Sequence, residues 1–358
     1  MSSHNSIYIN TKLSQENEYM NKNRIIVLKN ESKYNIFSST YIIIVIVYII
    51  FFFSIIYTKE EFFIEHFTNI KEIKSEIKGK DLKNLKVCVC TLAKLENRYI
   101  REFVEHYKKY GVDKIFLYDN NDVNGEKFEE IINDHIQNGF VQILNWRGRY
   151  KALYPIMNDC YRKNYHNYDW LIFYEIDEYI HLDNYSNIKL FLNQSKFNNC
   201  QQIYLNLVCH TDNNLLFYEN KSLAVRFPHH VPITKISGKQ LEMKTIIRGH
   251  YKGIYISNNH LGDIRLKSCN SSGKYESLLG HYTLNGDQKY YYIDHYYSKS
   301  TEEFILKITK GDALRPDKGY IYERIEKYFK QNEITKEKID MIEQKVHINL
   351  DKYKKNLG

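Results

Sequence analysis

The sequence has few of the residues that mark several familiar classes of protein. Its 358 residues include 4 Pro, 2 Trp and 6 Cys, and no Cys-x-x-Cys pair or Cys/His spacing typical of a zinc site occurs. Basic residues form no long run, and the formal net charge of +8 is spread along the chain. These absences argue against a structural zinc site and against a nucleic-acid partner.

Two phosphate-binding motifs are missing as well. Neither G-x-G-x-x-G nor G-x-x-x-x-G-K-[S/T] occurs in the chain, so neither a dinucleotide-binding fold nor a P-loop is supported. Hydrophobic residues make up 43% of the chain and charged residues 26%, which is ordinary for a folded protein and excludes a disordered or collagen-like one. The 33 Tyr and 18 Phe are expected mainly as core and surface residues.

One segment near the N-terminus is far more apolar than the rest of the chain. Residues 34–58 carry no charge, and residues 37–57 form a continuous hydrophobic run. About 20 residues of helix cross the hydrocarbon layer of a bilayer, so we expect a transmembrane signal anchor at 37–57. A cleaved signal peptide would have a shorter apolar region of about 7–15 residues that ends in small residues.

The charges around this run predict its orientation. Lys22, Arg24, Lys29 and Lys33 precede it, whereas Lys59 and Lys71 follow within a similar distance. The positive-inside rule then places a tail, residues 1–36, in the cytosol. We therefore expect a single-pass type II membrane protein of the Golgi or ER, with most of the chain in the lumen. Four N-x-S sequons fit a glycoprotein of that compartment: Asn184, Asn193, Asn220 and Asn270.

The six cysteines are compatible with one to three disulfides in an oxidising lumen. Cys200 and Cys209 are close enough in sequence to close a small loop. Cys88 and Cys90 lie two residues apart on an expected strand, so both point to one face and are expected to be buried. The sequence does not determine which cysteines pair.

A regular α/β pattern follows a Lys- and Glu-rich stem at 58–85. Strands are expected at 86–93, 113–119, 140–146 and 169–177, and helices at 97–110, 126–137 and 155–164. This alternation predicts an α/β fold with a mainly parallel central sheet. Ligands of such sheets bind at the carboxyl ends of the strands. Beyond residue 300 the chain is expected to be helical and charged.

Polar residues gather where these strands end. Thr91 and Glu96 follow the first strand, Asp119 the second, Arg147 the third, and the acidic run Glu175, Asp177 and Glu178 ends the fourth. Two carboxylates two residues apart project to one side of an extended segment. Hard oxygen ligands so placed suit Mn²⁺ or Mg²⁺, which screens the diphosphate of a leaving group. This rim is therefore the expected ligand site.

Four ordered segments resemble motifs of glycosyltransferase family 92 and its relatives in family 2. They are VCTLAKLENRYIREFVEHYKKYGVDKIFLYDNND (89–122), NDC (158–160), YDWLIFYEIDEYIHL (168–182) and IDHYYSKSTEEFILKITKGDA (293–313). The resemblance covers residues 86–313 and implies a GT-A-type nucleotide-sugar-binding domain there, with a C-terminal helical extension at 314–358. It also implies a metal-dependent, inverting hexosyltransferase that uses a UDP-sugar and a glycan acceptor. Known family 92 members are β-galactosyltransferases, so galactose is the first candidate sugar.

The resemblance also assigns residues. It implies that Glu175, Asp177 and His295 bind Mn²⁺ or Mg²⁺, with Glu175 standing where the family has Asp, and His260 is the alternative to His295. The implied nucleotide-sugar contacts are Thr91, Glu96 and Asp119 for the uridine and Lys299 for the diphosphate, and the position of Arg147 on the rim adds it to this set. Lys310 is a further candidate.

An inverting transfer needs a carboxylate base for the acceptor hydroxyl. Glu178 and Asp287 are the catalytic candidates and Asp263 is another, and Glu178 is equally suited to orienting Asp177. A different class remains open: a non-catalytic glycan- or nucleotide-binding membrane protein on a degenerate transferase fold, favoured by Glu175 in place of Asp. A lumenal phosphohydrolase would need more metal ligands than the sequence offers.

Overall fold

The computed structural model describes residues 84–231, 241–275, 282–283, 290–310 and 318–354. The expected cytosolic tail, transmembrane segment at 37–57 and most of the stem lie outside these ranges, as does Asp287. Among the described residues, no helix has the length and apolar character needed to cross a bilayer.

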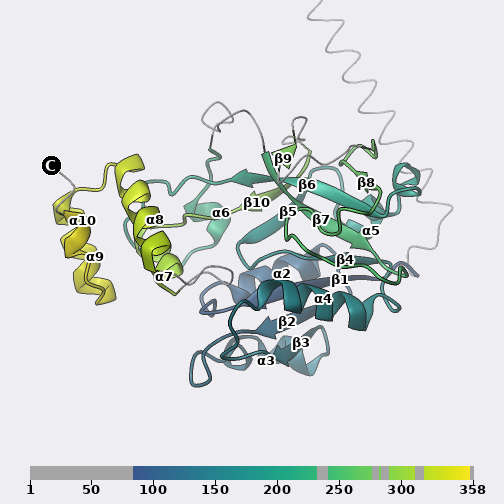
Figure 1. Ribbon diagram of the computed structural model, residues 1–358, viewed down its shortest axis with the longest axis horizontal. Helices are drawn as coiled ribbons and strands as arrows, with labels where there is room; N and C mark the ends of the chain where they lie inside the picture. The colour runs from purple at the N-terminus through teal and green to yellow at the C-terminus, as the bar shows by residue number, and fades with distance from the viewer. Residues whose placement is uncertain (1–83, 232–240, 276–281, 284–289, 311–317, 355–358) are drawn as a thin grey trace, which may run out of the picture. The chain divides into compact units, whose positions relative to one another are not determined.

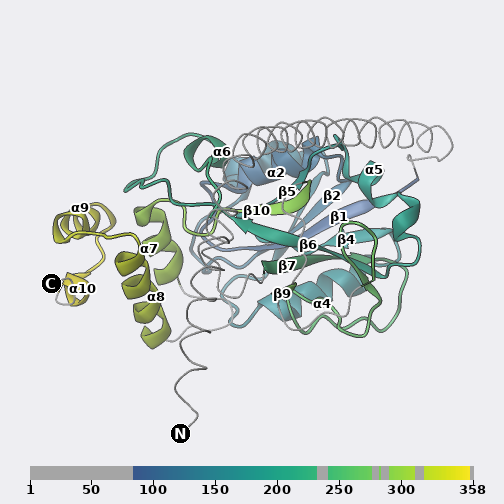
Figure 2. The same ribbon diagram turned by 90° about the horizontal axis from the view of Figure 1, so that it is seen from above.

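The first half of the described chain forms the parallel sheet that the sequence predicts. The strands lie in the order β3-β2-β1-β4 and all pairs are parallel. Helices α2 and α4 lie on opposite faces of the sheet (Figures 1 and 2). The elements are β1 (Val87–Ala93), α2 (Ile100–Lys109), β2 (Lys114–Asp119), α3 (Glu129–Gln137), β3 (Val141–Asn145), α4 (Leu153–Asn164) and β4 (Trp170–Ile172).

The burial pattern explains why these segments form the parallel half of the sheet. Every residue from Val87 to Cys90 in β1 is buried, as expected for a central strand covered on both faces. The apolar stripe of α2, which the sequence places at intervals of three and four residues, is buried against the sheet. The helix is followed by Gly111 at φ +78, where an added Cβ would lie 2.2 Å from the side chain of Asn187.

The second half of the sheet is mixed, so the prediction of a mainly parallel sheet is wrong there. The order continues β4-β7-β6-β10-β5, with β7 antiparallel to both neighbours and β10 parallel to β6 but antiparallel to β5. Long crossover helices are absent among the described residues of this half, so the chain returns through loops and short turns. The elements are β5 (Glu178–Leu182), α5 (Ile188–Leu192), η1 (Ser195–Phe197), β6 (Gln202–Cys209), α6 (Leu223–Arg226), β7 (Leu241–Arg248), β8 (Ser268–Cys269), β9 (Tyr282–Thr283) and β10 (Tyr291–His295).

The strand expected at 169–177 is shorter in the structure than the sequence predicts. β4 ends at Ile172, and a turn leads to β5, which begins at Glu178 and pairs with β10 instead of with β7. The N–H of Glu178 donates to the carbonyl of Glu175 at 3.0 Å and closes the turn. The carboxylates therefore sit on a turn between two strands and not on an extended segment.

The C-terminal helices share a core of their own. Phe304, Ile305 and Ile308 of α7 pack with Ile325 and Phe329 of α8 and with residues of α9 and α10. The helices are α7 (Thr301–Thr309), α8 (Lys318–Gln331), α9 (Lys336–Val346) and α10 (Asp351–Lys354). Ser300 begins α7 with a capping box completed by Glu303.

Two disulfides cross-link the described residues. Cys90 of β1 bonds to Cys160 of α4, and Cys200 bonds to Cys269 of β8. Cys88 is buried as expected and, like Cys209, is a free thiol. The suggested loop between Cys200 and Cys209 is therefore wrong, because Cys209 ends strand β6 and its thiol faces His295.

We predict that non-reducing peptide mapping of the oxidised protein recovers Cys90–Cys160 and Cys200–Cys269, with Cys88 and Cys209 alkylated once the chain is unfolded. Because each bond closes a long loop, replacing Cys200 by Ser should lower the free energy of unfolding by about 2–4 kcal/mol. A peptide that links Cys200 to Cys209 would contradict the structure.

Candidate functional site

The carboxyl ends of β1, β2 and β3 bring together the predicted rim residues. The Arg147 guanidinium lies 2.6 Å from Oδ2 of Asp119, and the other oxygen of that carboxylate accepts the N–H of Asn121 at 2.9 Å. Arg147 also donates to the carbonyl of Glu126 at 2.6 Å. The buried Asp119 and the partly buried Arg147 thus form one ion pair at the end of β2.

Several buried polar atoms at this rim have no partner within the described part of the chain. They are Oγ1 of Thr91 in β1, Oε2 of Glu96 in the loop after β1, and Nδ2 of Asn121 after β2. Buried polar groups in folded proteins are nearly always hydrogen-bonded, and exceptions commonly mark a site filled by water or a ligand. The amide of Asn121 is a polar group of this rim that the sequence analysis did not single out.

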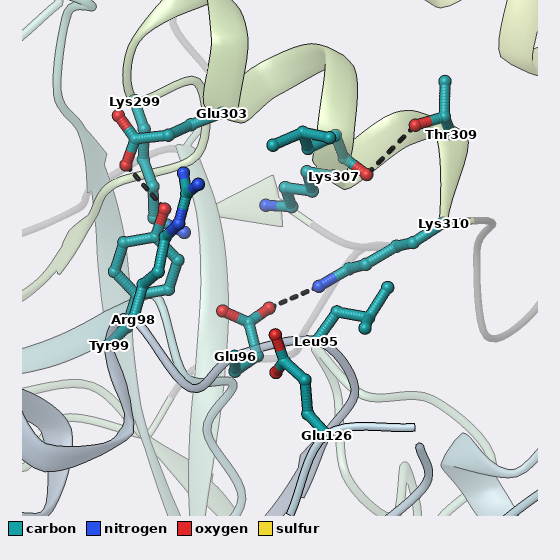
Figure 3. A pocket seen from close by; sticks show the side chains of 11 residues that line it. Leu95, Glu96, Arg98, Tyr99, Glu126, Lys299, Glu303, Lys307, Thr309 and Lys310 are labelled. Carbon is teal, nitrogen blue, oxygen red and sulfur yellow. Dashed lines mark hydrogen bonds and ion pairs between the residues drawn. The ribbon is translucent and has the colours of Figure 1, made fainter. Parts of the chain in front are cut away.

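A cavity of 320 Å³ opens between the loop after β1 and helix α7. Lys307 and Lys310 point into the space between α7 and Glu96 (Figure 3), and the ammonium of Lys310 bonds Glu96 and the carbonyl of Lys94. The lining residues are Leu95, Glu96, Arg98, Tyr99, Glu126, Lys299, Glu303, Leu306, Lys307, Thr309 and Lys310.

Lys299 lies deep in the wall of this cavity. Its backbone has φ 52, and its ammonium lies 4.0 Å above the ring of Tyr99. Burial lowers the pKa of Lys299, while the carboxylates of Glu96 and Asp177 oppose that shift. Lys299 and Glu96, two of the residues that the sequence suggests for nucleotide-sugar binding, thus line the same cavity.

Lys244 of β7 pairs with two of the three acidic residues at the turn between β4 and β5, Glu175 in the turn and Glu178 at the start of β5. Its buried ammonium lies 2.7 Å from Oε1 of Glu175 and 3.0 Å from Oε1 of Glu178. Burial opposes the charged form of Lys244, but the two carboxylates outweigh it and raise the pKa of the ammonium. Lys244 lowers the pKa of Glu175 to about 2, whereas burial raises the pKa of Glu178 and the ammonium of Lys244 opposes that rise.

Asp177 takes its partners from other elements. Its carboxylate pairs with Lys307 of α7 and lies 3.8 Å from Nε2 of His295 on β10. Burial disfavours the charged carboxylate, but Lys307 and His295 outweigh it and hold the pKa of Asp177 below its usual range. Burial lowers the pKa of His295 to about 4. At neutral pH the site therefore holds an ionised Asp177 and a neutral His295.

These protonation states suit a divalent metal. Carboxylate and neutral imidazole donors are ligands that Mn²⁺ accepts, and ligands must be deprotonated to bind. Glu175, Asp177 and His295 therefore fit the metal by donor type. One oxygen each of Glu175 and Asp177 is engaged by a lysine, so the metal would bind the other oxygens or displace those ammonium groups.

The remaining candidates have structural partners. His260 Nδ1 lies 2.9 Å from the carbonyl of Met243. Asp263 accepts from the side chain of Arg265 and from the N–H of Tyr255, which anchors its own loop. The carboxylate of Glu178, 1% exposed, accepts the N–H of Glu175 at 3.0 Å.

Lys244 and Lys307 are residues that the sequence analysis missed. Lys244 lies in a strand of mixed apolar and charged residues, LEMKTIIR, that matches no motif, and only the pairing of β7 next to β4 reveals its position. Lys307 lies within the segment 293–313 that carries the family resemblance, so that segment was the available signal.

The comparisons with known proteins agree with the motifs. The sequence model of glycosyltransferase family 92 matches residues 83–350. A family 92 protein of Oryza sativa subsp. japonica is 30% identical over 98 residues, which cover 26% of this chain and 16% of that relative. One of Ricinus communis is 26% identical over 126 residues, 35% of this chain and 22% of that relative. The alignments thus span less than a quarter of either relative.

Solved structures are more distant. The crystal structure of S. aureus TarS 1–349 in complex with UDP-GlcNAc has a TM-score of 0.36 and 11% identity, and covers 68% of this chain and 72% of that one. The same protein in complex with UDP has a TM-score of 0.34 and 10% identity, covering 75% and 77%.

We predict that Lys244→Met destabilises the protein strongly. The substitution leaves Glu178 buried beside Glu175 without a cation, and breaking a buried pair in this way costs about 3–5 kcal/mol. Because Glu175 is half-exposed, we expect the lower end of that range. Urea unfolding followed by tryptophan fluorescence measures the change.

Lys330→Met is the matched control for this substitution. Lys330 pairs with Glu326 at 2.8 Å on the exposed surface of α8, and exposed pairs contribute less than about 1 kcal/mol. Equal effects of the two substitutions would contradict the role assigned to Lys244.

Proposed function

Because the chain belongs to glycosyltransferase family 92, we propose that it transfers a hexose from a UDP-sugar to a glycan acceptor, with galactose the first sugar to test. The observation that carries this proposal is the cavity between the loop after β1 and α7, whose wall includes Lys299, Lys307 and Lys310. Lys307 and Lys310 now pair with Asp177 and Glu96, so a diphosphate would bind by taking over these ammonium groups.

The diphosphate would lie against the lysines of α7. Burial disfavours a charged Lys307, but Asp177 outweighs it and raises the pKa of the ammonium, so this group stays positive at neutral pH. Lys310 reaches the cavity from the end of α7. A departing UDP would be stabilised there by fixed positive charge, which is most effective where water is excluded.

The uridine would occupy the rim beside this cavity. The support is the set of unpartnered buried atoms at Thr91, Glu96 and Asn121, which a base and ribose can satisfy. The ion pair of Asp119 and Arg147 lies at the same end of the sheet.

We also propose that Glu175, Asp177 and His295 hold Mn²⁺ or Mg²⁺. When bound, the metal would screen the diphosphate of the donor. The chain's own part is to keep Asp177 ionised and His295 neutral, which Lys307 and burial achieve. Glu178 and Asp287 remain the candidates for the base that accepts the acceptor's proton.

The proposed location is the lumen of the Golgi or ER, reached through a type II anchor at 37–57. Support comes from the two disulfides, which persist in oxidising compartments and are rare in the cytosol. Asn184 and Asn220, two of the four sequons, are exposed and therefore open to glycosylation.

One observation favours the second candidate function, a binding protein without turnover. Both acidic residues of the acid-x-acid motif carry a lysine partner, Glu175 with Lys244 and Asp177 with Lys307. If these ammonium groups permanently replace the metal, nucleotide would bind without metal-dependent transfer.

We predict that the full chain in detergent releases UDP from one of UDP-galactose, UDP-glucose and UDP-GlcNAc when Mn²⁺ and an acceptor are present, and that EDTA stops the release. Asp177→Asn should lower kcat about 100-fold, because the proposed metal loses a charged ligand and with it the screening of the departing diphosphate.

Asp340→Asn is the matched control. Asp340 is exposed and pairs with Lys354 in the C-terminal helices, so its substitution should leave turnover unchanged. UDP binding without release from any donor would favour the binding protein, and full activity of Asp177→Asn would defeat the assignment of this carboxylate.

A further inference from the structure

A second group of potential metal ligands lies apart from the cavity, around Asp294 on β10. Successive residues of a strand point to opposite faces of the sheet, so Asp294 faces away from the side on which His295 meets Asp177. His210 directly follows β6, which pairs with β10, and His230 forms a bridge with His210. Side chains distant in sequence thus converge on one carboxylate.

The distances within this group are those of a metal site. Oδ1 of Asp294 lies 2.7 Å from Nε2 of His210 and 3.4 Å from Nε2 of His230. Nδ1 of His181 on β5 lies 3.6 Å from the other oxygen. Ligand atoms around a tetrahedral zinc, with bonds of about 2.0–2.1 Å, are roughly 3.3 Å apart. A zinc ion would therefore need only small side-chain movements.

The hydrogen bond of His210 supplies an independent argument. Its Nδ1 lies 2.6 Å from the carbonyl of Phe227, which can only accept, so Nδ1 carries the proton. Nε2 then faces the carboxylate of Asp294 at 2.7 Å, so either a proton or a metal ion lies between these two atoms. Histidine ligands of metals commonly donate their other N–H to a backbone carbonyl in this way.

The ion-pair partners of Asp294 are also compatible with a bound metal. In the described part of the chain, the ion-pair partners of Asp294 are all histidines, His181, His210 and His230. The other group of similar spacing, Glu105, Asp134 and His135, already contains the guanidinium of Arg101, 2.8 Å from Asp134. A lysine or arginine is therefore paired within that group, whereas the described residues offer only histidines to Asp294.

We propose that His210, His230 and Asp294 bind a zinc ion, with His181 positioned to complete the coordination. Two imidazoles and one carboxylate form a typical set of zinc donors. The ion would tie β10, the end of β6 and the segment that carries His230, and so stiffen the strand that carries His295. This proposal departs from the expectation, based on Cys/His spacing in the sequence, that the chain has no structural zinc site, because these ligands come from three separate segments. It is independent of the proposed transfer reaction.

Zinc titration of the full chain tests the proposal. The protein is purified without a histidine tag, stripped with chelator and titrated with Zn²⁺ by calorimetry, with Co²⁺ absorption as a second probe of coordination. Zn²⁺ can also enter the proposed site at Glu175, Asp177 and His295, so we expect one ion per chain in Asp177→Asn, where that site has lost a ligand. We expect His230→Ala to weaken the affinity of the ion at Asp294 by about tenfold or more, as the loss of groups in a metal site does.

Three further variants make the outcome decisive. His210→Ala should also abolish zinc binding. Because His210 is buried, this variant could fail to fold, and His230→Ala, at a half-exposed residue, then provides the test. His250→Ala, an exposed histidine beside Asp169, and Asp177→Asn should both retain the ion. Equal Zn²⁺ affinity in wild type and His230→Ala, no binding in the wild type, or loss of the ion in Asp177→Asn would overturn the proposal.

Discussion

The buried ammonium of Lys244 makes the acidic turn between β4 and β5 possible. Glu175 and Glu178 share this cation, and Glu178 and Lys244 are each only 1% exposed. An uncompensated charge at that depth would be far more costly than the pair. Asp177 is neutralised from a different element, by Lys307 of α7. The acidic residues at the turn are therefore paired with Lys244 of β7 on one side and with Lys307 of α7 on the other.

This pairing depends on where α7 begins. Ser300 and Glu303 cap the helix, and Glu303 also receives the hydroxyl of Tyr99 at 2.6 Å and the buried guanidinium of Arg226 at 2.6 Å. Tyr99 and Glu303 are 204 residues apart in sequence, so their hydrogen bond joins the loop after β1 to α7. The cavity between these two segments is thus shaped by contacts between the ends of the domain.

The periodicity of the sequence predicted the parallel half of the sheet because its pattern is local: α2 shows its buried stripe, and β1 its continuous apolar run. The acidic turn was predicted as a strand because Phe173 and Tyr174 are as apolar as β4, and only the pairing of β5 with β10 ends it. The partners Lys244, Lys307 and Cys269 come from distant segments, and no local pattern specifies such contacts. Residue types on the rim were predictable, but their partners were not.

A crystal structure of the protein with UDP and Mn²⁺ would show directly whether the nucleotide binds in the cavity between α7 and the loop after β1. We expect the diphosphate to lie in this cavity, with its oxygens near Lys307 and Lys310. The uridine should lie toward Thr91 and Asp119. Binding of UDP at another place, with Lys307 still paired to Asp177 and the cavity unoccupied, would contradict this expectation.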